Sequence, residues 1–324
     1  MTRLALPSLA ALGACGLTGL YAWVLTAFGR LEHPGQRSMH AKPVPTGAGI
    51  VVVFVIVLAW IVFGSARDHF HTMLLAVFAA LSAVSWFDDQ YRLPVGLRLA
   101  AHTLAVALLL GSLAPDLRLA PTLPLVLERT LLGVAWIWFI NLFNFMDGID
   151  GLAGAEVVAI AAGYAAVITA ARLGPSLLEL SLLAAAACAG YLVWNWHPAR
   201  VFMGDAGSIP FGFLTGWLMI DLAARGHWAA AIILPAYFAT DATLTLTRRI
   251  TTGKKPWQPH RSHFYQRAVL GRASPPVVVL HVVVANAVLL VFALVSIRFP
   301  IPALIAAAAV VGALLLDLSR LAKS

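Results

Sequence analysis

The class of fold is indicated by residues 131–170, LLGVAWIWFINLFNFMDGIDGLAGAEVVAIAAGYAAVITA. An apolar run lies on either side of a short polar segment that is rich in glycine and aspartate. Each run extends to about 18 to 20 residues, which is long enough to cross the hydrocarbon layer of a membrane as a helix. The stretch therefore predicts two transmembrane helices joined by a short polar connection.

The same pattern recurs from end to end of the chain. Hydrophobic residues make up 61% of the 324 residues and charged residues only 11%, roughly half the charged fraction of soluble domains. We therefore expect one all-α, membrane-embedded helix bundle over residues 1–324, with about 10–11 transmembrane helices. The expected spans are approximately 4–28, 47–64, 70–87, 96–114, 128–145, 152–171, 177–195, 209–224, 227–247, 277–297 and 300–319.

The connections between these spans alternate in character. Every second connection is basic or rich in motifs, and the others are short and plain. Of the 22 lysines and arginines, about 15 fall on the motif-rich side, which the positive-inside rule places in the cytoplasm. We expect the N-terminus outside, the C-terminus in the cytoplasm and no nucleic-acid partner, because topology accounts for most of the net charge of +8. The predicted cytoplasmic loops are approximately 29–46, 88–95, 146–151, 196–208 and 248–276.

Two adjacent carboxylates stand in the motif FDDQYRLPVGLRL, residues 87–99. Neighbouring residues on a helix point about 100° apart, so Asp88 and Asp89 cannot serve one point equally. We expect two different roles, such as a metal contact and a proton acceptor. The alternative is a hydrated helix end with Arg92 as the counter-ion, although two acids at a helix C-terminus oppose the helix dipole.

The motif NLFNFMDGIDGLAG, residues 141–154, places an oxygen-bearing side chain at every third position. On a continuous helix these four side chains would form one polar stripe. Gly148, Gly151 and Gly154 would let the backbone turn and leave amides free to face an anion. The alternative is that the polar side chains only join neighbouring helices. The stripe would consist of Asn141, Asn144, Asp147 and Asp150.

Asp205 lies between two glycines in the motif NWHPARVFMGDAGS, residues 195–208. An aspartate exposed in this way can approach a metal ion or a phosphate closely. It could equally cap the helix that is expected to begin near Ile209. We include Asn195, at the start of the motif, among the expected substrate-binding residues.

Two basic loops complete the predicted cytoplasmic face. HPGQRSMHAKPVPTGAG, residues 33–49, contains Arg37 and His40, and either binds an anion or only sets the topology. RRITTGKKPWQPHRSHFYQR, residues 248–267, contains His260, Arg261 and His263 among aromatic residues. Contacts to phosphate and sugar suit these side chains better than a zinc site, because no cysteine or third ligand lies close by. An interfacial anchor is the alternative.

Carboxylates and asparagines without sulfur ligands are typical of sites for Mg²⁺ or Mn²⁺ held together with substrate phosphates. Phosphoryl transfer needs mainly positioning and neutralisation of charge. The residues therefore predict a membrane enzyme that joins a water-soluble phosphate ester to a lipid phosphate. The rival prediction is a cation- or proton-coupled transporter that uses Asp221 and Asp241 inside the membrane. A transporter would, however, concentrate its charges near the midplane of the bilayer.

Taken in order, these motifs resemble those of the polyprenyl-phosphate N-acetylhexosamine-1-phosphate transferase family, over residues 30 to 270. The pair NxxNxxDGxDGL and PAxxFMGDxGS is the most specific part of the resemblance. HRSHFYQR looks most like the subgroup that initiates O-antigen synthesis in Gram-negative bacteria. HRSH in place of three histidines argues against a MurNAc-pentapeptide donor, whereas Pro34-Gly35-Gln36-Arg37 departs from the usual P-N-x-R.

The resemblance implies transfer of a HexNAc-1-phosphate of the GlcNAc, QuiNAc or FucNAc type from a UDP-sugar to undecaprenyl phosphate, with release of UMP. It implies Mg²⁺ as the cofactor, the bacterial inner membrane with its lipids as the location, and a homodimer as the assembly to expect. Direct attack by the lipid phosphate and a covalent aspartyl route both remain open.

The resemblance also suggests roles for individual residues. Asp205, together with Asp88, would hold the metal, and Asp88 would deprotonate the lipid phosphate beside Asp89. Phe202 would stack near the uracil, and the HRSH loop would hold the sugar and the pyrophosphate. The positions that would line the nucleotide site are Asn144, Asp147 and Asp150.

Overall fold

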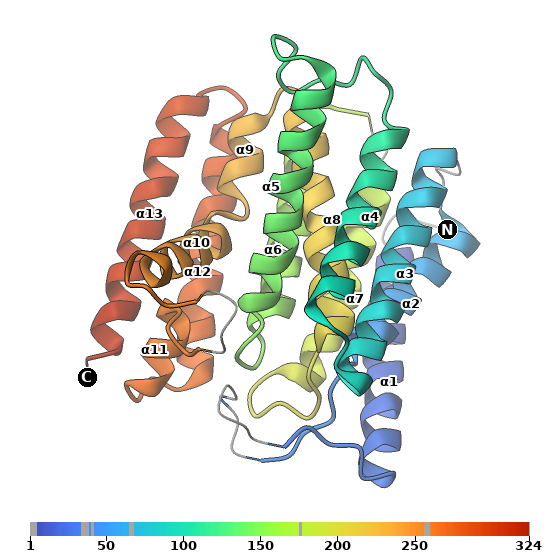
Figure 1. Cartoon of the computed structure of the whole chain (residues 1–324), viewed down its shortest axis with the longest axis vertical. Helices are drawn as coiled ribbons and strands as arrows, with labels where there is room; N and C mark the ends of the chain where they lie inside the picture. The colour runs from blue at the N-terminus through green and yellow to red at the C-terminus, as the bar shows by residue number, and fades with distance from the viewer. Residues whose placement is uncertain are drawn as a thin grey trace.

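The computed structural model describes residues 5–33, 39, 42–64, 68–174, 177–255 and 260–323. Helices dominate these residues, and an isolated antiparallel bridge joins Glu32 to Val44. Nine of the described helices are long and apolar enough to span a membrane, and α2 is a shorter apolar helix. The chain is therefore a multi-pass, all-α membrane protein (Figure 1). The helices are α1 Ala5–Ala27, α2 Gly49–Phe63, α3 His69–Tyr91, α4 Val95–Ser112, α5 Leu125–Phe145, α6 Leu152–Ala170, α7 Leu178–Asn195, α8 Asp205–Ala224, α9 Trp228–Ile233, α10 Ala236–Thr251, α11 Phe264–Leu270, α12 Pro275–Val295 and α13 Pro300–Leu321.

The expected continuous span 227–247 is wrong. The segment is broken at Leu234 and Pro235 into the short helix α9 and the longer helix α10. Proline has no backbone N–H and crowds the preceding turn, so a helix that reaches Pro235 ends or kinks there. Figure 1 shows α10 turned away from the direction of the long helices, towards α11.

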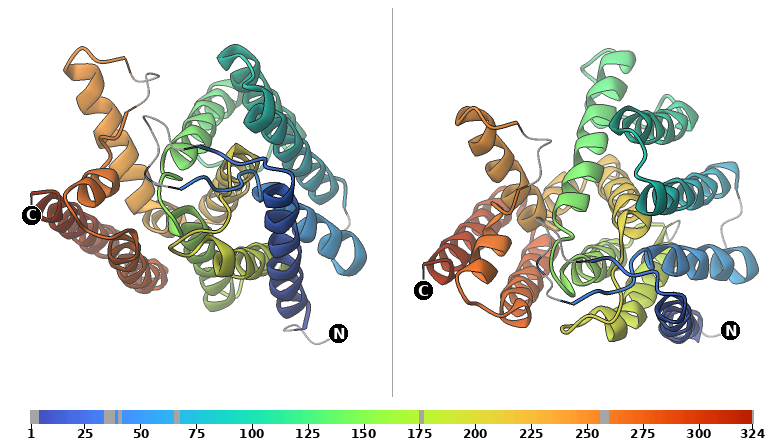
Figure 2. Two further views of the ribbon diagram at one scale, coloured as in Figure 1. Left: turned by 90° about the horizontal axis from the view of Figure 1, so that it is seen from below. Right: turned by 60° about the horizontal axis from the view of Figure 1, so that its bottom comes forward.

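Helix α8 is the centre of the bundle, and 89% of its most apolar 18-residue stretch is buried. It contacts α2, α3, α5, α6 and α9, and Figure 2 shows it surrounded by other helices. Close approach depends on small residues: a Cβ atom on Gly49 would lie 2.1 Å from the Cα atom of Gly207. Small residues at helix crossings are the usual means by which membrane helices pack their backbones together.

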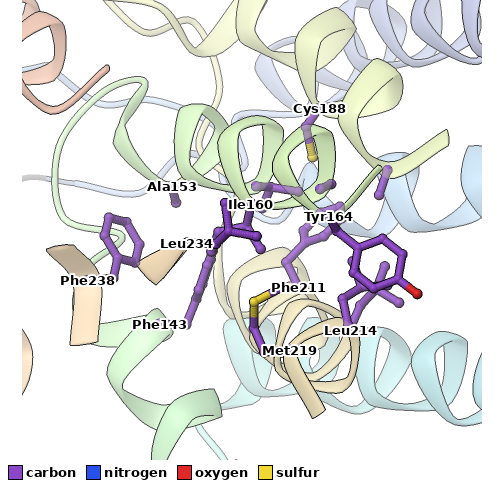
Figure 3. Close-up of a cluster of buried hydrophobic side chains, with 14 of the residues drawn as sticks. Phe143, Ala153, Ile160, Tyr164, Cys188, Phe211, Leu214, Met219, Leu234 and Phe238 are labelled. Carbon is purple, nitrogen blue, oxygen red and sulfur yellow. The ribbon is translucent and has the colours of Figure 1, made fainter. Parts of the chain in front are cut away.

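The apolar core lies between α8 and its neighbours. Figure 3 shows that aromatic and aliphatic side chains from several helices meet around α8. Trp136 on α5 stacks on Phe213 with ring centroids 4.8 Å apart, and its indole N–H donates to the carbonyl of the same residue. This packing fixes the depth of α8 against α5 and so sets where Asp205, the first residue of α8, meets the end of α5.

The motif-bearing connections all meet at one end of the bundle, which is the lower end in Figure 1. The C-terminal end of α13 also lies there, because a Cβ atom on Gly271 would lie 2.5 Å from the carbonyl oxygen of Leu321. The C-terminus and the motifs therefore share one face, as the sequence predicts. The side of the membrane that this face meets stays a prediction.

Candidate active site at one end of the bundle

Asp88 lies in the last turn of α3 and is 7% exposed. Its Oδ1 accepts a hydrogen bond from the backbone N–H of Leu93 at 2.7 Å, and its Oδ2 accepts one from Arg98 on α4 at 3.1 Å. The same guanidinium nitrogen lies 3.7 Å from Oδ2 of Asp205. Arg98 therefore joins the carboxylates of two motifs that are far apart in the sequence.

Asp89 has a different role from Asp88. Its two oxygens accept hydrogen bonds from the backbone N–H groups of Asp205 and Ala206, at 3.0 and 3.1 Å. These N–H groups belong to the first turn of α8 and have no partner within the helix, so a carboxylate there is favoured by the helix dipole. Gly204 adopts φ 70°, and a Cβ atom on it would lie 2.5 Å from Oδ2 of Asp89. A glycine is therefore required beside Asp205.

Asp205 is held between α5 and α8. Its Oδ1 accepts a hydrogen bond of 2.7 Å from the side-chain amide of Asn144, which also donates to Oγ of Ser208 at 3.0 Å. The alternative that Asp205 itself caps α8 is wrong, because the helix already begins at Asp205, its N-cap residue is Gly204, and the backbone N–H of Asp205 donates to Asp89.

The predicted polar stripe is only partly formed. Helix α5 ends at Phe145, so Asn141 and Asn144 are helical, whereas Asp147 and Asp150 lie in the following turn. The side chain of Asn141 donates to the carbonyl of Ile137 at 2.7 Å. The turn that follows packs closely against Tyr265, because a Cβ atom on Gly148 would lie 2.1 Å from its hydroxyl.

Asp147 nevertheless belongs to the carboxylate cluster. Burial, followed by the negative charges of Asp205, Glu32 and Asp150, raises the pKa of Asp147 to about 7. A carboxyl group that titrates near neutral pH is typical of a functional site, because a purely structural acid is usually paired with a cation. Together, Asp88, Asp89, Asp147 and Asp205 form what we call the carboxylate cluster.

Asp150 and Asn195 shape the loop that precedes Asp205. Asp150 accepts hydrogen bonds from His197 at 2.7 Å and from the backbone N–H of Ala199 at 3.0 Å. Asn195 is 5% exposed, accepts from the N–H of Gly151 at 2.9 Å, and donates to the carbonyl of Val201 at 2.9 Å. Both side chains therefore tie the 146–151 loop to the 196–204 loop, and their predicted contacts with substrate stay predictions.

Phe202 lies beside the first basic loop. Its backbone N–H donates to the carbonyl of Pro45 at 2.8 Å, and its carbonyl accepts from Ala48 at 3.1 Å. These bonds place its half-exposed ring at the same end of the bundle as Asp205. Arg37 and His40, the predicted anion-binding residues of this loop, lie outside the described residues.

The HRSH loop is anchored by Asp241, which is fully buried on α10. Oδ1 of Asp241 lies 3.2 Å from Nδ1 of His263 and accepts from the N–H of Phe264 at 3.1 Å. His263 is therefore buried, whereas Arg261 is exposed. Burial, followed by the positive charges of His263 and Arg249, lowers the pKa of His260 to about 4. The loop thus presents the half-buried imidazole of His260 and the exposed guanidinium of Arg261.

The hydroxyl of Tyr265 donates a hydrogen bond of 3.0 Å to the carbonyl of Phe145 at the end of α5. The HRSH segment is thereby joined to the 141–154 motif. The structure brings these motifs to one end of the bundle, but it shows no direct contact of His260 or Arg261 with the carboxylate cluster.

Arg98 and Ser208 are the residues of the site that sequence reasoning missed. Arg98 stands ten residues after Asp88 within the same motif, whereas Arg92 was the counter-ion in the alternative prediction of a hydrated helix end. Arg92 instead caps α3 in a left-handed conformation with φ 53°, and its side chain is exposed. The sequence did contain one indication of Arg98. This residue falls in the first turn of the helix after α3, and that helix packs beside α3.

The carboxylate oxygens of the cluster fit a magnesium ion that is bound partly by the protein and partly by substrate phosphates. Among the described residues, no three His, Cys, Asp or Glu side chains form a closed metal cage. Mg²⁺ commonly takes only one or two carboxylates and completes its shell with water and phosphate oxygens. Asp88 and Asp205, with oxygen ligands beside a shared arginine, can supply this number.

The carboxylates on which the transporter alternative rested have structural partners. Asp221 accepts hydrogen bonds from Tyr164 at 2.5 Å and from Arg225 at 2.6 Å, near the end of α8. Asp241 accepts a hydrogen bond from the backbone N–H of Phe264, the first residue of α11. Neither forms part of a chain of free ionisable groups along the described part of the bundle.

The chain also resembles known proteins. Residues 71–223 match the family model Glycosyl transferase family 4. The probable undecaprenyl-phosphate N-acetylglucosaminyl 1-phosphate transferase of Bacillus subtilis (strain 168) is 26% identical over 78% of this chain and 73% of its own length. The decaprenyl-phosphate N-acetylglucosaminephosphotransferase of Mycolicibacterium smegmatis is 28% identical over 77% of this chain and 71% of its own length.

A phospho-N-acetylmuramoyl-pentapeptide-transferase from Mycobacterium sp. (strain JLS) is 30% identical over 59% of this chain and 66% of its own length. The multi-pass helical bundle, the carboxylate cluster at one end of it and these relatives together identify a membrane-embedded transferase. The chain belongs to glycosyl transferase family 4, within the polyprenyl-phosphate sugar-phosphate transferases, and is a sugar-phosphate transferase.

Proposed function

We propose that the protein transfers a HexNAc-1-phosphate of the GlcNAc, QuiNAc or FucNAc type from a UDP-sugar to undecaprenyl phosphate. The products are undecaprenyl-pyrophosphoryl-HexNAc and UMP, which is the first membrane step of O-antigen or other cell-envelope polysaccharide synthesis. The observation that carries this proposal is the carboxylate cluster, in which Arg98 joins Asp88 to Asp205. The relatives named above support the polyprenyl phosphate and the amino-sugar phosphate as substrate classes.

In the direct route, an oxygen of the lipid phosphate attacks the sugar-bearing phosphorus of the UDP-sugar. A new P–O bond forms as the bond to the bridging oxygen breaks, and that oxygen leaves with UMP. Asp88 lies nearest Arg98 and is our candidate for removing any proton from the lipid phosphate. Arg98 can neutralise phosphate charge, because a guanidinium offers several N–H donors in a fixed plane.

Mg²⁺, or Mn²⁺ in its place, would be held by Asp205 and Asp88 and would neutralise charge on the reacting phosphates. Asp89 positions this site by capping α8, so that Asp205 faces Asn144 and Arg98. Asp147 and Asn144 lie beside Asp205 and are our candidates for contacts with the nucleotide. The site would face the cytoplasm at the bacterial inner membrane, with the protein acting as a monomer or a homodimer.

The experiment mixes the purified protein in detergent with undecaprenyl phosphate, Mg²⁺ and a panel of UDP-HexNAc donors, and measures the UMP released. We expect UMP with at least one donor and none when either substrate or the divalent metal is withheld. Absence of UMP from every donor, with the helical content intact by circular dichroism, would remove the proposal. UMP that forms without undecaprenyl phosphate would indicate hydrolysis and would contradict the proposed acceptor.

A further inference from the structure

Glu156 and Asn286 form a polar pair inside the bundle. Glu156 lies one turn into α6 and is fully buried, and Asn286 on α12 is 5% exposed. The side-chain amide of Asn286 donates a hydrogen bond of 2.7 Å to Oε2 of Glu156. Ionisable side chains within membrane-spanning helices are costly and are kept where they have a specific use. The reaction proposed above assigns no use to this pair.

The pair has more acceptors than donors. Among the residues that the structure describes, no group donates to Oε1 of Glu156 or to Oδ1 of Asn286, and both oxygens are shielded from solvent. Tyr237 on α10 lies within electrostatic reach of Glu156, but its hydroxyl donates to Asp241 at 3.3 Å. An ionised carboxylate with a single neutral donor is strongly disfavoured in an apolar interior. A proton on Glu156 would remove that charge and supply the missing donor.

The pair joins two helices that each follow a motif. Helix α6 begins directly after the turn at residues 147–151, and α12 follows the HRSH segment and α11. The two helices pack together from their first turns, because a Cβ atom on Gly151 would lie 3.8 Å from Cγ1 of Val279. The hydrogen bond between Glu156 and Asn286 holds them together farther from their motif ends. The position of the HRSH segment relative to the 141–154 motif therefore depends on this contact.

We propose that Glu156 is held as the neutral carboxylic acid and that it forms, with Asn286, a clasp that positions the HRSH segment against the 141–154 motif. In the clasp, the amide of Asn286 donates to Oε2 of Glu156, and the carboxyl proton on Oε1 donates to Oδ1 of Asn286. Each partner supplies one donor and one acceptor, and no charge is buried. Both are positioning residues, because they act through the HRSH segment. The inference rests on the proposed function for the role of that segment in binding the UDP-sugar.

The first test is infrared difference spectroscopy of the intact protein in detergent at neutral pH. A protonated carboxyl group has a C=O stretch above the amide band, whereas an ionised carboxylate absorbs below it. We expect the wild type to show a protonated-carboxyl band that Glu156→Gln lacks, and isotope-labelled glutamate should shift this band. Absence of a band that depends on Glu156 would overturn the neutral state. This test does not depend on whether a more disruptive variant folds.

The second test measures amide hydrogen–deuterium exchange over residues 260–270 by mass spectrometry. Glu156→Leu removes the polar contact and should speed exchange in this segment about tenfold, which corresponds to the loss of about one hydrogen bond. Glu156→Gln should match the wild type, because a carboxamide has the size of the neutral acid and keeps one donor and one acceptor. Equal exchange in the two variants would overturn the clasp.

The matched control is Tyr164→Phe on the same helix. Tyr164 is buried, and its hydroxyl donates to Asp221 on α8. Its replacement also removes a buried hydrogen bond of α6, but one that does not reach α12. Tyr164→Phe should lower the melting temperature and leave exchange over residues 260–270 unchanged. Faster exchange there in this variant would show a general loosening of α6 and would overturn the specific role of the pair.

Enzyme kinetics separate this inference from the proposed function. Glu156→Leu should raise the KM for the UDP-sugar about tenfold with little change in kcat, whereas Glu156→Gln should keep the wild-type KM. A folded Glu156→Leu variant with the wild-type KM would overturn the positioning role alone. A wild-type protein that releases no UMP from any donor would remove the proposed function, and the infrared and exchange measurements would still decide the clasp.

Discussion

The two ends of the bundle treat buried carboxylates in opposite ways. At the end away from the motifs, Glu128 on α5 is 2% exposed and accepts hydrogen bonds from Arg118 and from the N–H groups of Leu119 and Ala120. Its charge is balanced within one local loop. At the other end, the carboxylate cluster gathers four acids, and Arg98 lies beside two of them, Asp88 and Asp205. The cluster has more carboxylates than neighbouring cations, so a bound ligand such as a metal ion can balance the remaining charge.

The largest expected effect comes from Asp205→Asn. The substitution removes one negative charge from the cluster but keeps the shape of the side chain. Turnover should fall by about a hundredfold or more, as is usual when charge stabilisation of a transition state is lost. The measurement is UMP release at saturating substrates. Glu128→Gln is the control at the other end and should lower the melting temperature while the folded enzyme keeps its kcat. Residual activity of Asp205→Asn above about one tenth of wild type would remove Asp205 from the proposed metal role.

The next effect distinguishes the two adjacent aspartates. Asp88→Asn should lower kcat by about a hundredfold, because the candidate base can no longer accept a proton. Asp89→Asn should retain more activity and instead destabilise the fold by about 1 kcal/mol, because it weakens the cap of α8. Turnover and thermal unfolding of both variants measure the difference. Equal kinetic losses with equal stability would contradict the separate roles.

A stability effect is expected at Asp147. Its pKa is raised to about 7 in the folded protein, so the folded state binds a proton more tightly than the unfolded chain does. The contribution of Asp147 to stability is therefore present at pH values below the unfolded pKa and is lost as the pH rises towards 7. Asp147→Asn, which cannot ionise, should gain melting temperature relative to wild type between pH 5 and pH 8.

Thermal unfolding with a chelator present measures this difference without interference from metal binding. Asn144→Asp offers the opposite control, because it adds a carboxylate beside Asp205 and should increase the loss of stability at high pH. A difference between wild type and Asp147→Asn that is constant with pH would show that Asp147 titrates normally.

The smallest effect is expected at Tyr265→Phe. This substitution removes the hydrogen bond to the carbonyl of Phe145 and leaves the buried ring in place. The free energy of unfolding should fall by about 1 kcal/mol, with at most a small change in kcat. Chemical denaturation in detergent would detect the change. A kcat loss as large as that of Asp88→Asn would show that the junction between the HRSH segment and α5 controls the chemistry directly.

Some errors of the sequence reading share one physical cause. The polar stripe does not continue to Asp147, which lies in a turn after α5 whose Gly148 packs against the hydroxyl of Tyr265, a residue more than a hundred positions away. The alternative prediction, a hydrated helix end, named Arg92 as the counter-ion, but Arg98 on the next helix is the arginine that pairs with Asp88. Both outcomes depend on contacts between segments that are distant along the chain or on different helices, and no local spacing records them.

Hydropathy and motif spacing were enough to predict the class of fold, the end of the bundle that carries the chemistry and most of the residues of the carboxylate cluster. Hydropathy marks the helices that cross a membrane, and bare carboxylates beside such helices have few other uses. The separate roles of these residues follow from how the helices pack. The packing made Asp89 the cap of α8 and left Asp88 and Asp205 to share Arg98. These features arise from the depth and angle at which helices pack, which the whole set of contacts determines together.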